Sequence, residues 1–143
     1  MELFEQIVRF ETDFWNAIEQ QLSRSGQVGV ATLQALRALD HHEGSGRVQE
    51  LSRELSITIG AASKLVDRLE NAGLATRRPH PEDRRSSLVS LTPAGQKARR
   101  GAEAVARPFT ARVLGDSEDV SAFANALHRL QRRLEKATRE LIA

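Results

Sequence analysis

The order of local signals between residues 56 and 95 constrains the fold more than any other feature of the sequence. An amphipathic helical pattern ends at Gly73, where a left-handed residue commonly terminates a helix. Two strand-like stretches follow, residues 75–79 and 87–91, separated by turn residues and arginines. Thr92-Pro93 then supplies an N-cap and a first helical residue. The segment therefore predicts a helix, a β-hairpin with a basic tip and a second helix in direct succession.

This succession is the layout of a winged helix-turn-helix. In that motif a recognition helix enters the major groove of DNA, and a hairpin, the wing, can reach the flanking minor groove. The expected recognition helix runs from the N-cap Thr58 to about Ala72, and residues 56–58 form the turn before it. Its spacing predicts a buried stripe of Ala62, Leu65, Val66 and Leu69.

The remaining chain is predicted to be helical. Helices are expected at about residues 2–24, 31–41, 47 or 48 to 55, 93–114 and 118–142, with a turn cluster at 43–46. Pro108 is expected to kink or break the fifth helix, because proline cannot donate a backbone hydrogen bond. The predicted fold class is mainly α (α+β), with a winged helix-turn-helix lobe between N- and C-terminal helices.

The two terminal helices carry apolar stripes that need a partner. In the last helix the apolar residues step by three and four in an unbroken heptad pattern. Such a stripe is too long for the small core that 143 residues can bury, so both terminal helices are predicted to form a homodimer. The expected dimerisation residues are Leu3, Ile7, Phe10, Val120, Phe123, Leu127, Leu130, Leu134 and Leu141.

Charge is distributed unevenly along the chain. Residues 1–46 hold three basic and seven acidic residues, a net charge of −4, whereas residues 47–100 hold eleven and six, a net of +5. Residues 101–143 hold seven and six, a net of +1. Positive charge thus concentrates over the winged segment, as binding to phosphates requires, although charge runs are often only solvated faces.

Several classes of protein are disfavoured by composition. The chain has no cysteine, which excludes disulfides, thiolate metal sites and a cysteine redox switch. No run approaches the roughly 20 apolar residues of a membrane span, and the N-terminus lacks a signal-peptide core, so a cytoplasmic location is expected. No phosphate-binding loop or G-x-S-x-G motif is present, so neither an enzyme, a catalytic residue nor a cofactor is predicted.

At this point the sequence resembles the MarR family of bacterial transcriptional regulators. The resemblance is carried by Leu65-Val66-Asp67-Arg68-Leu69-Glu70, Gly73-Leu74, Arg77-Arg78, Pro81, Asp83, Arg85, Val89, Leu91, Thr92 and Gly95. It implies one domain over residues 1–143, with dimerisation helices at about 1–25 and 110–143. The winged lobe would span about 30–95, and a linking helix about 93–114.

The family resemblance also implies a function. Such proteins are homodimers that bind double-stranded DNA at a pseudo-palindromic operator, usually as repressors. A small aromatic or phenolic effector typically releases them, from a cleft between the dimerisation and DNA-binding regions. An alternative is a protein-interaction module that keeps the winged fold but no longer reads DNA; the basic wing argues against it. A second alternative, an enzyme or carrier that binds a small molecule in the helical cleft, has no positive support in the sequence.

The sequence departs from the family pattern at three places. Gly60-Ala61 stands where many relatives have serine or threonine at the start of the recognition helix, so base readout must depend on Ser63, Lys64 and Arg68. Gly29 stands where relatives often have a polar helix cap. The cysteine of peroxide-sensing relatives is missing, so that sensing chemistry does not carry over.

The candidate DNA-binding residues lie on the recognition helix and the wing. They are Thr58, Gly60, Ala61, Ser63, Lys64, Arg68, Arg77, Arg78, Arg84 and Arg85. The resemblance gives Arg85 a place in the minor groove, with Asp83 supporting it, while Arg84 is expected to meet phosphate. Strand alternation sends Arg77 and Arg78 to opposite faces, so one reaches phosphate and the other braces the domain; which one does so stays open here. The simpler alternative is a solvated helix face with surface ion pairs.

Histidines and aromatic residues carry weaker hypotheses. His41-His42 more readily cap the second helix than bind a metal, since adjacent helical residues do not face one another, and no metal site is predicted. Phe14 and Trp15 are candidate ligand-binding residues in the first helix, although an aromatic stripe at helical spacing is more often core or interface.

Overall fold

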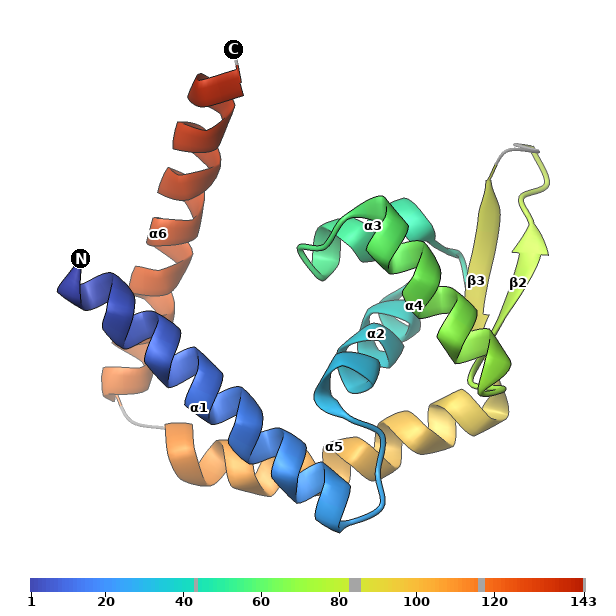
Figure 1. The fold of residues 1–143 in the computed structure, drawn as a ribbon, viewed down its shortest axis with the longest axis horizontal. Helices are drawn as coiled ribbons and strands as arrows, with labels where there is room; N and C mark the ends of the chain where they lie inside the picture. Colours follow the sequence, from blue (N-terminus) through green and yellow to red (C-terminus); the bar gives the residue numbers. More distant parts are fainter. Residues whose placement is uncertain (43, 83–85, 116–117, 143) are drawn as a thin grey trace. The chain divides into compact units, whose positions relative to one another are not determined.

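The computed structural model describes residues 1–42, 44–82, 86–115 and 118–142. Figure 1 shows a mainly helical chain with a small antiparallel sheet, which confirms the predicted fold class. The elements in chain order are α1 (Glu2–Arg24), α2 (Val30–His41), β1 (Gly46–Arg47), α3 (Val48–Glu54), α4 (Ile59–Asn71), β2 (Ala75–Pro79), β3 (Ser87–Leu91), α5 (Pro93–Leu114) and α6 (Glu118–Ile142). The predicted helices and wing strands therefore lie where the sequence places them, within one residue at each end.

The chain divides into two compact units, residues 1–107 and 108–143. The boundary falls at Pro108, within α5. The predicted break of the helix there is wrong, because α5 continues through Pro108 to Leu114. A proline inside a helix removes one backbone hydrogen bond, and the surrounding turns of α5 keep theirs.

The sheet has one strand that the sequence did not predict. Its order is β1-β3-β2, with both pairings antiparallel. The first strand has only two residues, Gly46 opposite Val89 and Arg47 opposite Leu88, where a turn and a helix start were expected. Two residues are too few to show an alternating pattern. Their pairing covers the β3 edge that the wing hairpin would otherwise leave open.

One apolar core holds the winged lobe together. It joins buried residues of α2, α3, α4, β2 and β3, among them Leu36, Leu39, Leu51, Val66 and Val89. The predicted inward stripe of α4 is confirmed, since Ala62, Leu65, Val66 and Leu69 are all buried. Figure 1 shows the β2–β3 hairpin beside these helices, with α4 next to β2. Burial of one face of α4 therefore fixes which residues its opposite face presents to solvent.

The turn after α4 is fixed by backbone and side-chain contacts. Gly73 adopts φ +70°, and Leu74 N–H donates to Leu69 O at 2.8 Å, which confirms the predicted left-handed end of the helix. Thr92 locks this turn to α5: its N–H donates to Leu74 O, its hydroxyl donates to Gly73 O, and it accepts from Gly95 N–H. The Thr92-x-x-Gly95 pattern thus joins α5 directly to the end of the recognition helix.

Candidate nucleic-acid interface

The first turn of α4 is capped by its own sequence. Thr58 adopts an extended conformation, and its hydroxyl accepts a hydrogen bond from Ala61 N–H at 3.2 Å, as predicted for an N-cap. Thr58, Gly60 and Ala61 are all exposed. A Cβ built on Gly60 would meet nothing within 4 Å. The start of the helix is therefore an open surface onto which another molecule can dock closely.

Two basic side chains stand on the outward face of α4. Lys64 and Arg68 are exposed, and neither forms a hydrogen bond or ion pair with the residues that the structure describes. Ser63 is half-buried on the flank of the same helix. A free ammonium and a free guanidinium on a helix with a buried opposite face match the chemistry of phosphate and base-edge contacts.

Arg77 lies on β2 and is turned toward α4. Its Nη1 lies 2.7 Å from Asp67 Oδ1 and 3.4 Å from Glu70 Oε2, and its Nη2 donates to Ser63 O at 3.2 Å. Its backbone N–H also donates to Glu70 Oε1 at 2.9 Å. One arginine thus ties the wing to three positions of the recognition helix. Of the two arginines on β2, Arg77 is the one that braces the domain.

Arg78 points to the other face of the strand. It is exposed, and its Nη2 donates to Gly44 O at 3.0 Å. No carboxylate within the described residues pairs with Arg78, so its positive charge can interact with a negatively charged partner. The alternation predicted for the two arginines therefore holds, and it separates a bracing residue from an exposed cation.

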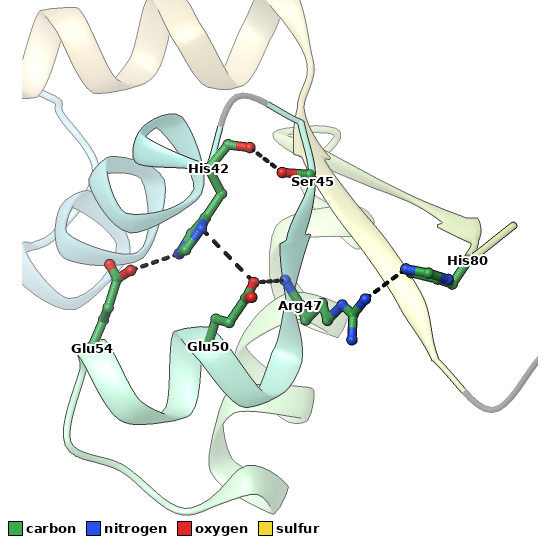
Figure 2. Close-up of polar contacts among 6 residues, drawn as sticks. All are labelled: His42, Ser45, Arg47, Glu50, Glu54 and His80. Carbon is green, nitrogen blue, oxygen red and sulfur yellow. Dashed lines mark hydrogen bonds and ion pairs between the residues drawn. The ribbon is translucent and has the colours of Figure 1, made fainter. Parts of the chain in front are cut away.

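The wing tip, with Asp83, Arg84 and Arg85, lies outside the described residues. The base of the tip is closed by His80 N–H, which donates to Ser86 O at 3.1 Å. Figure 2 shows the His80 ring facing Arg47, with Arg47 Nη2 2.6 Å from His80 Nε2. Arg47 thereby connects the start of α3 to the wing.

A second histidine links α2 to α3 on the same side of the lobe (Figure 2). His42 is the C-cap residue of α2, as the capping hypothesis predicts. Its Nε2 lies 2.6 Å from Glu54 Oε1, and its Nδ1 lies 3.8 Å from Glu50 Oε2. Glu50 Oε2 also accepts from Arg47 N–H at 2.8 Å, and this side chain caps the start of α3. Among the described residues no group of three or more histidine, aspartate or glutamate side chains is arranged to hold a metal ion.

The apolar stripes of both terminal helices are exposed in the single chain. Leu3, Ile7 and Phe10 of α1 are between 37% and 65% exposed. In α6 the residues Phe123, Leu127, Leu130, Leu134 and Leu141 are between 38% and 87% exposed, and Val120 is partly buried. These large apolar surfaces are unusual for a monomer in water and are typical of a protein–protein interface.

The two candidate ligand-binding residues lie in α1. Phe14 and Trp15 are half-buried, and the Phe14 ring stacks on Phe10 with centroids 5.6 Å apart. Trp15 lines a hollow of about 260 Å³ together with Glu11, Thr12 and Asn16. Phe14 does not line this hollow. The structure therefore places Trp15 at a concave surface and Phe14 in the aromatic stripe.

The end of α1 also caps the start of α2. Gly29, the N-cap of α2, has no side chain to accept from the helix, and Glu19 Oε2 accepts from Val30 N–H at 2.7 Å instead. A Cβ on Gly29 would lie 2.5 Å from Glu19 Oε1. The polar cap that relatives often place at this position is thus supplied by a residue ten positions earlier.

Three features of the winged lobe and its neighbouring helix were not predicted from the sequence. Glu19 and the Arg47–His80 pair act across long sequence separations, so no local pattern marks them. Ile59, at the start of α4, is 57% exposed although it lies three residues before the buried Ala62, so its spacing gives no signal of this exposure. No helix in the described part of the chain is long and apolar enough to cross a membrane.

Comparison with known proteins places this arrangement among transcriptional regulators. A sequence profile described as the MarR family matches residues 27–86. The uncharacterized HTH-type transcriptional regulator YfiV of Bacillus subtilis is 31% identical over 110 residues, which cover 76% of this chain and 68% of that protein. The multiple antibiotic resistance protein MarR of Salmonella typhimurium is 46% identical over 46 residues, only 32% of each chain.

The fold is also similar to solved structures. A cysteine-to-serine variant of MarR from Escherichia coli, crystallised with operator DNA, superposes with a TM-score of 0.79. The two chains are 22% identical, and the superposition covers 90% of this chain and 92% of the other. At that identity the likeness concerns the fold, and the winged lobe with its flanking helices is shared.

Proposed function

The chain belongs to the MarR family of winged helix-turn-helix, DNA-binding transcriptional regulators, and we propose that it is a homodimeric repressor that binds a pseudo-palindromic operator in the cytoplasm. The observation that carries this proposal is the pairing pattern of the basic residues. Arg77 forms ion pairs within the lobe. By contrast, three basic residues have no acidic partner among the described residues: Lys64 and Arg68 on α4, and Arg78 on β2. Three cations without an acidic partner, two on the recognition helix and one on the wing, are suited to a phosphate backbone.

The recognition helix would read the major groove and the wing the minor groove. In this arrangement α4 enters the major groove with Thr58, Gly60, Ala61 and Ser63 nearest the bases, and Lys64 and Arg68 contact bases or phosphates. Arg85 would enter the flanking minor groove with Asp83 holding it, and Arg84 would contact phosphate. Two recognition helices related by a dyad require half-sites about 10 base pairs apart, centre to centre.

Dimerisation would use the exposed stripes of α1 and α6. Segments 1–25 and 110–143 contain all exposed large apolar side chains of the described chain except Ile59. Burying them against a second copy removes that surface from water, and no stable folded monomer is expected. A dimer also supplies the two-fold symmetry that a pseudo-palindromic operator requires.

A small aromatic or phenolic effector would regulate the repressor. The hollow beside Trp15 supports this part of the proposal, because an indole face and neighbouring polar groups suit a flat aromatic molecule. Since the hollow is lined by α1 alone, an effector bound there would act on the helix that caps α2 through Glu19. It would thereby bias the position of the DNA-binding lobe.

Selection from a random duplex library tests the proposed function. Purified full-length protein should enrich sequences with two half-sites about 10 base pairs apart, and binding should weaken steeply with salt. The variant Lys64→Ala should bind the enriched duplex more weakly and still form dimers. Asn71→Ala, at the end of α4, is the matched control and should bind as the wild type does. Enrichment of no sequence, together with no binding of random duplex at low salt, would instead favour a protein-interaction module.

A further inference from the structure

One large apolar side chain on the winged lobe has no role in the core or in the proposed dimer. Ile59 is the first residue of α4 and is 57% exposed. The other exposed large apolar side chains of the described chain all lie within residues 1–10 or 113–141, inside the segments proposed to dimerise. Ile57, two residues before, packs against the core instead. The exposure of Ile59 therefore needs a separate explanation.

Helix formation does not explain an isoleucine at this position. A β-branched residue has lower helix propensity than alanine or leucine, and Thr58 already caps the helix by accepting from Ala61 N–H. An exposed isoleucine also leaves apolar surface in contact with water. A partner that covers this side chain would remove that surface from water.

The surroundings of Ile59 determine what kind of partner fits. Gly60 offers only a Cα to an approaching molecule, and a Cβ built there would meet nothing within 4 Å. Ala61 adds an exposed methyl group. Ser63, one turn along, is half-buried and its carbonyl is occupied by Arg77. The leading turn of the recognition helix therefore presents mainly C–H surface, with few side-chain hydrogen-bonding groups.

In the major groove the apolar feature of a base edge is the C5 methyl group of thymine. The N-terminal residues of a recognition helix are the ones that contact base edges. We propose that Ile59 is a specificity-determining residue that packs against a thymine methyl group in each half-site. This inference rests on the proposed function, and it adds a class of base contact that the basic and hydroxyl residues of α4 do not provide.

The size of the effect follows from the methyl group itself. Removing one buried methyl group should weaken binding about fourfold. A dimer makes the contact twice, so loss at both half-sites should weaken binding roughly sixteenfold. Truncating Ile59 to alanine removes more surface and should cost at least as much. Since contact partners share one interaction, the two losses should not add.

The experiment uses thymine-to-uracil replacement, which removes only the methyl group. Duplexes enriched by the wild-type protein are synthesised with uracil at one thymine position at a time, changed symmetrically in both half-sites. Dissociation constants are measured by fluorescence anisotropy for wild type, Ile59→Ala, Ile59→Val and the control Asn71→Ala. Thermal unfolding confirms that each variant is folded. Ile59→Val keeps the β-branch, so it serves as the test variant if Ile59→Ala is unstable.

At one thymine position the wild type and Asn71→Ala should lose roughly sixteenfold in affinity with uracil. Ile59→Ala should bind the thymine duplex about as weakly as wild type binds the uracil duplex, with almost no further loss to uracil, and Ile59→Val should be intermediate. Equal uracil penalties in wild type and Ile59→Ala, or enriched half-sites without a methyl-sensitive thymine, would overturn the inference. Those outcomes leave the proposed function standing, since the wild type still selects DNA; failure to select any sequence would remove both.

Discussion

Replacing Gly95 by alanine should destabilise the protein, although Gly95 lies within a helix where alanine is normally preferred. Gly95 is buried in the first turn of α5, and a Cβ there would lie 1.9 Å from Leu74 O. Real Cβ atoms are essentially never closer than 3.0 Å to such an atom, so the two backbone segments must separate by at least 1.1 Å. Neither side of this contact is a flexible side chain.

The cost can be worked out from the contacts that such a movement breaks. Leu74 O accepts from Thr92 N–H at 3.0 Å, and Gly73 O accepts from the Thr92 hydroxyl at 2.6 Å. Losing one or both hydrogen bonds costs about 1 kcal/mol each, and overpacking costs about 1–3 kcal/mol. Alanine regains about 1 kcal/mol of helix propensity. We therefore expect Gly95→Ala to lower the free energy of unfolding by about 1–4 kcal/mol.

Gly101→Ala is the matched control in the same helix. Its Cβ would lie 2.6 Å from Gln27 Oε1, the end of a side chain that can rotate away, so the change should be neutral or stabilise by up to about 1 kcal/mol. Urea unfolding, followed by circular dichroism at one fixed protein concentration, measures both variants. If Gly95→Ala is as stable as wild type, or Gly101→Ala loses as much, the reasoning from backbone contact is wrong.

Two further predictions concern the caps and the dimer. Glu19→Ala and Gly29→Ala should each destabilise the protein by about 1 kcal/mol, because both remove the carboxylate from Val30 N–H. The double variant should cost no more than one of them in urea unfolding, and full additivity would contradict the shared mechanism. Leu130→Glu should yield unfolded or aggregated protein in sedimentation velocity. The control Arg132→Glu, on the opposite face of α6, should remain dimeric. A folded, soluble wild-type monomer at micromolar concentration would refute the obligate dimer.

The features that could be predicted from the sequence are those set by neighbouring residues. The inward stripe of α4, the cap at Thr58 and the left-handed Gly73 each depend on residues within one or two turns. Their spacing is visible in the sequence because an α-helix repeats every 3.6 residues. The position of the recognition helix, and therefore the face that we propose to meet DNA, follows from them.

The features that could not be predicted depend on contacts across the fold. β1 exists because Gly46 and Arg47 meet β3, and a two-residue strand has no pattern of its own. Arg77 and Arg78 alternate as expected, but only the packing of β2 against α4 determines that Arg77 faces Asp67 and Glu70. Pro108 does not break α5, because a helix of this length tolerates the loss of one hydrogen bond.

Contacts within the fold give Arg77 and Arg68 different roles, which a count of basic residues does not distinguish. The guanidinium of Arg77 faces two carboxylates, Asp67 and Glu70, and its side chain is only 28% exposed. The local charge around it is therefore negative, which opposes a phosphate contact. Arg68 has no partner among the described residues and is exposed. Arg77 should act on DNA binding only by holding α4 against the wing, and Arg68 by neutralising phosphate.

Salt dependence distinguishes these roles where affinity alone does not. Arg77→Ala and Arg68→Ala should both weaken binding to an enriched duplex. Each phosphate contact contributes about 0.9 to the slope of log affinity against log salt, so Arg68→Ala should lower the slope of a dimer by nearly two. Arg77→Ala should leave the slope unchanged, because it removes a brace and no counterion is involved. The slope is measured by anisotropy titrations between about 50 and 200 mM salt. A slope for Arg77→Ala that falls as far as that for Arg68→Ala would show that Arg77 contacts phosphate and that its ion pairs open on DNA.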